Sequence, residues 1–156
     1  MNATIKLEKK HFPVLLNELE SIISPLYGGT FIDCTFGQGG YSKKILEKKN
    51  NKIIAVDRDK DVYLYAKKFE KKYNDRFHYE NIKFSEINTI NVNSKDLKAV
   101  IFDLGYSFNQ IKDLSKGLSF KSTGKLNMKM GLNEFSCHEV ISNMSERNLY
   151  KIFKYY

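Results

Sequence analysis

The sequence predicts an α/β fold with a doubly wound parallel sheet, and three features of the chain lead to this prediction. Residues 31–57 read as a strand, a glycine-rich turn, a short helix and a second strand that ends in Asp57. Residues 99–103 form an apolar run that ends in an acid, which is typical of a buried parallel strand. Helical patterns separate the strand segments, and this alternation is typical of helices that cover a parallel sheet.

The first half of the chain predicts three helices and two strands. Apolar residues recur at helical spacing after Pro13, a residue that suits the first turn of a helix. The next strand leads through the glycine-rich turn into a second helix. In chain order, the sequence predicts a helix over residues 11–26, a strand over 30–33, a helix over 40–49, a strand over 52–57 and a helix over 59–73.

Two further strands follow, and then the composition of the chain changes. We expect a strand over 77–80, a short helix over 83–87 and the fourth strand over 99–103. Residues 105–133 are rich in Gly, Ser, Asn and Lys and have weak periodicity. This change of composition indicates that a different kind of structure begins soon after the fourth strand.

Helical patterns resume near the end of the chain. Ser136 has Glu139 three residues later, which is the pattern of a capping box. A last helix begins at Ser145 and runs to Tyr156 without a capping residue. A doubly wound sheet usually has strands on both sides of its switch point, and only four strands are predicted here. We therefore expect an incomplete sheet: either a fragment of a longer protein, or a small domain with an exposed sheet edge.

The glycine-rich loop predicts a site for a nucleoside cofactor. Gly37, Gly39 and Gly40 allow close approach of the backbone to a ligand, and Asp57, 18 residues after Gly39, is placed to accept hydrogen bonds from ribose hydroxyls. Ser42 stands where a dinucleotide fingerprint needs its third glycine, so NAD is a weaker alternative. The spacing favours S-adenosylmethionine, and the alternative is a purely structural tight turn without a ligand.

Other candidate site residues lie near the ends of the later strands. Asp103 ends the fourth predicted strand, where a carboxylate is placed to hold the amino group of a cofactor or a substrate amine. We take Asp103 as the candidate catalytic residue, with a turn or capping aspartate as the alternative. Phe84 is placed either to pack against an adenine ring or to join the core. Within Asp57-Arg58-Asp59, we expect two members to be surface charges and an N-cap.

Composition limits the other classes of function. The net charge of +8 makes RNA a plausible partner, although lysine pairs often only solvate a helix face. The two cysteines and three histidines have no metal-ligand spacing, so we expect no metal. Neither a membrane span nor a signal peptide is indicated, which favours a cytoplasmic protein.

Six motifs follow one another in a fixed order along the chain: His11 to Glu18, Asp33 to Ser42, Asp57 to Asp59, Asp103 to Gln110, Lys116 to Phe120 and Leu126 to Met130. Together they resemble one known family, the bacterial 16S ribosomal RNA cytosine-N4 methyltransferases (RsmH, formerly MraW). The resemblance covers almost the whole chain from His11 onward.

This resemblance implies a Rossmann-like, S-adenosylmethionine-dependent enzyme that methylates the N4 amine of a cytidine in 16S rRNA. It also implies that residues 1–110 are the N-terminal part of the methyltransferase domain, and that residues 111–156 begin an inserted helical domain that helps to hold RNA. The alternative is a truncated, non-catalytic fragment that binds cofactor or RNA. The small ribosomal subunit is the implied partner, and a second copy of the chain is a further candidate. The cofactor contacts implied by the resemblance are Gly39, Gly40, Tyr41, Asp57, Phe84, Asp103 and Gln110.

The chain departs from the family pattern at a few positions. Tyr41 stands where the glycine loop normally ends in histidine, so a side-chain contact to the cofactor is expected to change. Phe108 and Asn109 replace the usual Ser and Pro, and Asn127 and Lys129 replace an Asp and an Arg. These last two exchanges alter whatever charge pairing the family's aspartate and arginine maintain.

Overall fold

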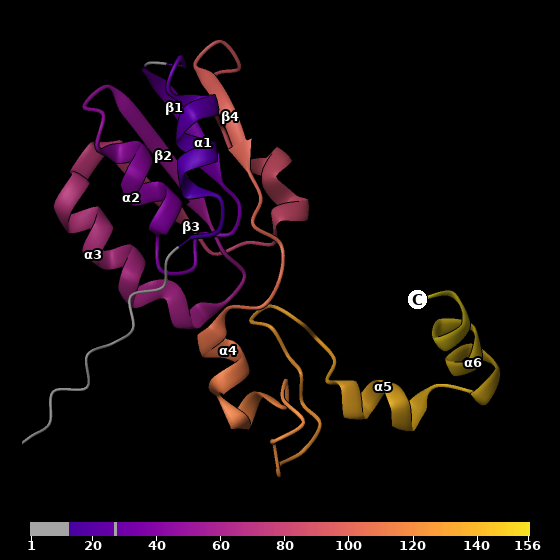
Figure 1. Cartoon of the computed structure of the whole chain (residues 1–156). Coiled ribbons are helices and arrows are strands. Elements are labelled where there is room, and N and C mark those ends of the chain that lie inside the picture. Colours follow the sequence, from indigo (N-terminus) through magenta and orange to yellow (C-terminus); the bar gives the residue numbers. More distant parts are fainter. Residues whose placement is uncertain (1–12, 27) are drawn as a thin grey trace, which may run out of the picture.

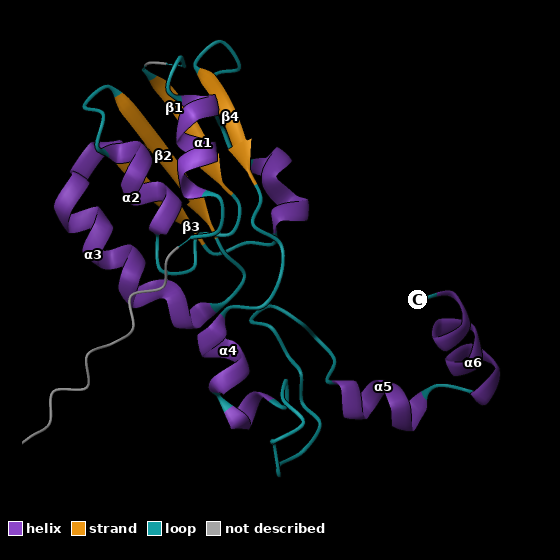
Figure 2. Ribbon diagram, viewed as in Figure 1, coloured by secondary structure: helices purple, strands orange, loops and turns teal. Residues whose placement is uncertain are grey.

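The computed structural model describes residues 13–26 and 28–156, and it contains one parallel sheet with helices on both faces (Figures 1 and 2). The strands are β1 (Gly29–Asp33), β2 (Asn51–Val56), β3 (Phe77–Glu80) and β4 (Leu97–Ile101). The α-helices are α1 (Leu16–Ile23), α2 (Gly40–Leu46), α3 (Tyr63–Tyr73), α4 (Phe108–Lys112), α5 (Cys137–Asn143) and α6 (Glu146–Tyr155). Short 3₁₀ helices are η1 (Lys60–Val62), η2 (Asn74–Arg76), η3 (Phe84–Thr89) and η4 (Leu114–Lys116).

The strand order is β3-β2-β1-β4, and every pair of neighbouring strands is parallel. The chain moves outward from β1 to β2 and β3, and then returns to the other side of β1 as β4. The order therefore reverses between β1 and β4, and open α/β sheets bind ligands outside the carboxyl ends of their strands at such a point. The predicted α/β class is confirmed, and the order matches part of a Rossmann-like sheet.

Alternate residues of the strands build two separate cores. Phe31 on β1 and Ile53 on β2 pack with residues of α1, α2 and α3 on one face. Ile32 and Val56 point to the other face, where apolar residues of the segment 82–92 cover them. Figure 2 shows α2 and α3 on one side of the sheet. A period of two residues along each strand explains this division.

The fourth strand differs from its prediction in position and in burial. It ends at Ile101 rather than at residue 103, because β1 ends at Asp33 and Asp33 pairs with Ile101. Beyond this pair the ladder has no partner residues. Within the described residues β4 pairs with β1 alone, and Val100 is 37% exposed. The apolar run is therefore an edge strand, and the prediction of a buried strand was wrong.

The other predicted elements are present, but α4 and η4 lie in a segment for which no helix was predicted. The segment predicted as a helix over residues 83–87 is the 3₁₀ helix η3, and α2 ends at Leu46, three residues before the predicted end. The capping box is confirmed: Ser136 Oγ accepts a hydrogen bond from Glu139 N, and the Glu139 carboxylate accepts one from Ser136 N. The first predicted helix begins at Leu16; residues 11 and 12 lie outside the described part of the chain.

The C-terminal segment extends away from the sheet. Figure 1 shows α5 and α6 to one side of the sheet, reached through the irregular segment that follows α4. The division of the chain after residue 110 stays a prediction. Among the described helices, none combines the length and the apolar composition that crossing a bilayer requires.

Candidate cofactor site at the carboxyl edge of the sheet

The glycine loop joins β1 to α2 and has left-handed backbone at two of its glycines. Gly37 has φ of 53°, and Gly39, which precedes α2, has φ of 78°. A Cβ on Gly39 would lie 2.5 Å from the Phe69 ring, and a Cβ on Gly40 would clash with Pro13. Both glycines therefore allow close packing of the loop on the protein. A Cβ on Gly37 would meet only Thr35 O, at the ordinary contact distance of 3.9 Å, and Gly37 itself is partly exposed.

Asp57 directly follows β2, as predicted, and its carboxylate is tied to the glycine loop. Oδ2 accepts a hydrogen bond from Gly37 N at 2.8 Å, and Oδ1 accepts one from Asp59 N at 2.8 Å. Burial raises the pKa of Asp57, while these backbone hydrogen bonds oppose that rise. An ionised carboxylate has about four acceptor positions, so two bonds leave capacity for ligand hydroxyls.

A second carboxylate under the loop was missed by the sequence reasoning. Asp33, the last residue of β1, is fully buried, and its Oδ2 accepts a hydrogen bond from Ser42 Oγ at 2.7 Å. Its Oδ1 accepts a longer one, 3.3 Å, from Thr35 N. Burial raises the pKa of Asp33 to about 6, against the effect of the Ser42 hydrogen bond. The signal available in the sequence was a Ser nine residues after a strand-end Asp, in the first turn of the next helix.

Asp103 lies two residues beyond β4, in an exposed loop that is fastened to the glycine loop. Its backbone N donates to Thr35 Oγ1 at 2.8 Å. Its Oδ2 lies 3.2 Å from the hydroxyl of Tyr41, which also donates to Val14 O at 2.6 Å. Of the predicted site residues, the structure thus brings Tyr41 and Asp103 into direct contact.

Phe84 lies at the surface rather than in the core. It is 40% exposed and begins η3, and its ring meets the 46% exposed ring of Phe102 edge to face at 5.8 Å between centroids. Phe102 immediately precedes Asp103 in the chain. The two rings therefore form an exposed apolar surface beside the carboxyl edge, with a face of the kind on which an adenine ring stacks.

Gln110 lies on α4 and bonds to protein groups at both ends of its amide. Its Nε2 donates to Asp59 Oδ2 at 2.6 Å, and its Oε1 accepts from Ser107 N at 2.9 Å. Asp59 caps η1, as expected of one member of its triplet, but it is buried (4% exposed) rather than on the surface. Lys116 Nζ lies 3.5 Å from the same carboxylate oxygen. Burial opposes ionisation of Asp59, yet the hydrogen bonds from Gln110 and Asp61 N lower its pKa.

The predicted residues thus fall into three groups along one edge. Asp57 joins the glycine loop, Tyr41 joins Asp103, and Gln110 joins Asp59 two residues after Asp57. Phe84 stands apart, against Phe102. Within the part of the chain that the structure describes, no group of three or more His, Cys, Asp or Glu side chains is arranged to hold a metal ion.

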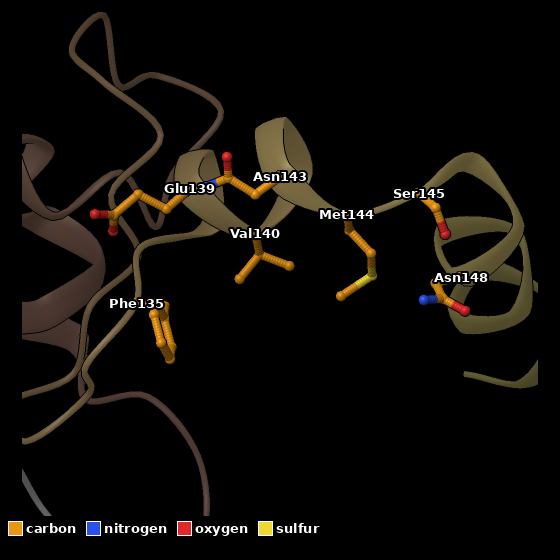
Figure 3. Close-up of a pocket in the computed structure, with 7 residues that line it drawn as sticks. All are labelled: Phe135, Glu139, Val140, Asn143, Met144, Ser145 and Asn148. Atoms are coloured by element: carbon orange, nitrogen blue, oxygen red, sulfur yellow. The ribbon is translucent and has the colours of Figure 1, made fainter.

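A cavity lies elsewhere, beside α5 and α6 (Figure 3). It has a volume of about 510 Å³ and is open to solvent. Glu139, the one carboxylate in its lining, is engaged in the capping box of α5. The lining residues are Phe135, Glu139, Val140, Asn143, Met144, Ser145 and Asn148. Since this cavity has no pair of titratable groups, chemical reasoning favours the sheet edge as the site.

The chemistry of the sheet edge fits a charged nucleoside cofactor. Asp57 presents a carboxylate for hydroxyl donors, and Asp103 presents an exposed carboxylate for an ammonium group. Gly37 is partly exposed, and Phe84 offers a half-exposed ring. S-adenosylmethionine carries hydroxyls, an ammonium group and an aromatic ring, in addition to its sulfonium and its carboxylate.

Comparison with known proteins identifies related sequences. The chain is similar to proteins named Ribosomal RNA small subunit methyltransferase H from Orientia tsutsugamushi (strain Boryong; 39% identity over 139 residues, 89% of this chain and 45% of the relative) and Ehrlichia ruminantium (strain Welgevonden; 37% over 150 residues, 94% and 50%). The relative of that name from Zymomonas mobilis is 38% identical over 149 residues, which are 94% of this chain and 45% of the relative.

The chain therefore spans about half the length of the curated relatives that it matches. Residues 8–156 also match the model of one protein family, the MraW methylase family. This match covers most of the chain, and it agrees with the glycine loop and the parallel sheet described above. The chain belongs to the MraW methylase family.

Proposed function

We propose that this chain provides the S-adenosylmethionine-binding part of an rRNA methyltransferase that acts on the N4 amine of a cytidine in 16S rRNA. One observation carries the cofactor assignment: the glycine loop, Asp57 and Asp103 lie together at the edge where the strand order of a parallel sheet reverses. The names of the relatives support ribosomal RNA of the small subunit as the substrate. The cytidine N4 position comes from the resemblance of the motifs.

Each of three site residues is assigned to a different part of the cofactor. Asp57 accepts hydrogen bonds from the ribose hydroxyls, since each of its oxygens keeps acceptor capacity beyond its backbone hydrogen bond. Asp103 accepts a hydrogen bond from the amino group of the methionine part, and Phe84 packs against the adenine. When bound, S-adenosylmethionine supplies a methyl group on a sulfonium sulfur whose positive charge already activates it for displacement.

The protein contributes alignment and electrostatics to the transfer. The attacking amine gains positive charge as the new bond forms, and a nearby carboxylate favours that charge. Asp103 is the candidate for this role, either directly or by fixing the cofactor in line with the amine. A cytidine in structured RNA must be splayed out of its stack to reach the edge of the sheet.

The C-terminal segment is proposed to help hold RNA. Residues 111–156 would begin a helical domain, and exposed aromatic and basic side chains of α6, such as Tyr150 and Lys154, suit contacts with bases and phosphates. The division after residue 110 and the pairing of two copies of the chain stay predictions.

Calorimetric titration of this chain with S-adenosylmethionine tests the cofactor assignment, with NAD as the control ligand. We expect saturable binding of S-adenosylmethionine alone. Asp57→Asn removes the charge while keeping the shape, and we expect it to weaken binding about 10- to 100-fold, as for loss of charge-assisted hydrogen bonds. Asp75→Asn, at an exposed acid of η2, is the matched control. Binding of NAD with equal affinity, or full binding by Asp57→Asn, would contradict the proposal.

A transfer assay then separates the enzyme from the non-catalytic alternative. Unmethylated small-subunit RNA is incubated with the chain and tritiated cofactor, digested to nucleosides and separated by chromatography. Label in N4-methylcytidine supports the proposed reaction. Cofactor binding without transfer would instead support a fragment that binds cofactor but does not complete the reaction, and label in another nucleoside would refute the N4 assignment.

A further inference from the structure

Tyr41 links three segments of the chain at the carboxyl edge of the sheet. It is the second residue of α2, and its side chain is 8% exposed. Its hydroxyl donates to Val14 O, just before α1, at 2.6 Å. The same hydroxyl lies 3.2 Å from Asp103 Oδ2, in the loop after β4. Tyr41 therefore contacts a candidate catalytic carboxylate that is 62 residues away in the chain.

The hydroxyl of Tyr41 acts as a donor to both neighbours. Burial, and then the charge of Asp103, raise the pKa of Tyr41 to about 12, so the phenol keeps its proton at neutral pH. A carbonyl oxygen and an ionised carboxylate are both acceptors only. Since a phenol carries one proton, Val14 O and Asp103 Oδ2 share it.

Asp103 depends on such contacts because it lies outside the sheet ladder. β4 ends at Ile101, and the Asp103 side chain is exposed. Thr35 Oγ1 fixes its backbone N, and Tyr41 contacts its Oδ2. Both anchors come from the loop and helix that follow β1. The same loop holds Asp57 through Gly37 N, so one loop sets the positions of both carboxylates.

We propose that Tyr41 is a positioning residue that orients the Asp103 carboxylate toward the amino group of the cofactor's methionine tail. This inference rests on the proposed function, because it takes S-adenosylmethionine as the ligand of the edge. It gives the buried tyrosine a role through Asp103 rather than through a contact of its own with the ligand.

The first test measures the contact itself and needs no cofactor. Urea unfolding of the full 156-residue chain is compared for the unmodified protein, Tyr41→Phe, Asp103→Ala and the double variant. We expect the double variant to lose less stability than the two single variants lose together. The difference should correspond to a factor of about 2 to 5 in the unfolding equilibrium constant. Tyr73→Phe, at a partly buried ring that packs on Phe69, should combine additively with Asp103→Ala. Additive behaviour of Tyr41→Phe as well would overturn the proposal.

The second test asks what the contact is for. S-adenosylhomocysteine and methylthioadenosine both carry the adenosine and a neutral sulfur, but only the first has the amino-acid tail. We expect Tyr41→Phe to weaken S-adenosylhomocysteine about 3- to 10-fold and methylthioadenosine less than about 2-fold. Equal losses for both ligands would indicate a distorted loop, and no loss for either would remove the role; both overturn the inference. Failure of the unmodified chain to bind either ligand would overturn the proposed function, a result that is recognised without any variant.

Discussion

The buried carboxyl of Asp33 predicts a specific dependence of stability on pH. Asp33 is fully buried at the end of β1, and burial raises its pKa from 3.8 to about 6. The folded chain therefore binds a proton that the unfolded chain has already lost between about pH 4 and pH 6. Stability falls as pH rises through this window, because the folded state binds more protons there. The pKa of Asp33 is raised by about two units, and each unit corresponds to about 1.4 kcal/mol. The free energy of unfolding can therefore fall by at most about 3 kcal/mol across this window.

Asp33→Asn isolates this effect. The amide oxygen can accept from Thr35 N, while the amide nitrogen donates to Ser42 Oγ after the hydroxyl rotates. The free energy of unfolding of both proteins is measured in urea at intervals from pH 4 to pH 8. As the pH rises, we expect the free energy of unfolding of the unmodified protein to fall relative to that of Asp33→Asn, by up to about 3 kcal/mol.

The difference between the two proteins matters here because other acids contribute slopes of their own. The hydrogen-bonded carboxylate of Glu139 has a pKa lowered to about 2, which gives stability at neutral pH that is lost on acidification. That contribution cancels when Asp33→Asn is compared with the unmodified chain. Asp75→Asn, at an exposed acid, serves as the control. A difference between Asp33→Asn and the unmodified chain that stays constant from pH 4 to pH 8 would refute the reasoning.

Three further predictions concern packing and capping. Phe31→Ala, at a fully buried ring, should lower the free energy of unfolding by about 3–5 kcal/mol in urea titrations, and a loss below about 1 kcal/mol would mean that the site collapses. Gly39→Ala should cost more than about 1 kcal/mol, because of φ and of the Phe69 contact, whereas Gly124→Ala, which has open space, should cost little; equal costs in thermal unfolding would contradict the geometry. Ser136→Ala should cost about 1 kcal/mol of helix stability and reduce the circular dichroism signal at 222 nm, while Ser136→Asp should retain it; identical spectra for all three proteins would show that the cap is dispensable.

Local patterns predicted the strands well, and pairing decided the rest. The third strand was predicted at residues 77–80, where the structure has it, because its apolar residues and its bounds are local features. The fourth strand was placed two residues late. Its end depends on the register of Asp33 with Ile101, and no local pattern in the sequence records that pairing. Its exposure likewise depends on which strands lie beside it.

The candidate site was predicted in outline but not in its connections. Asp57 lies at the predicted edge because a carboxylate after an apolar strand is a local signal. The contact between Tyr41 and Asp103, and that between Gln110 and Asp59, join residues 62 and 51 positions apart. Such pairs arise from the topology of the sheet. The buried state of Asp59 was therefore missed, although its capping role was expected.

Apolar cores hold the sheet together, whereas polar contacts around Asp59 attach the segment that follows it. The described cores of the sheet contain buried residues only as far as Ile101. The segment that follows is attached to the end of β2 by Gln110 and Lys116 and by a hydrogen bond from Arg58 Nε to Met130 O. Protonation of Asp59 in acid would weaken its contacts with Gln110 and Lys116, whereas the apolar packing of the sheet does not depend on that charge. The segment can therefore loosen in acid while the sheet persists, and thermal melting at a pH low enough to protonate Asp59 would then proceed in two steps instead of one.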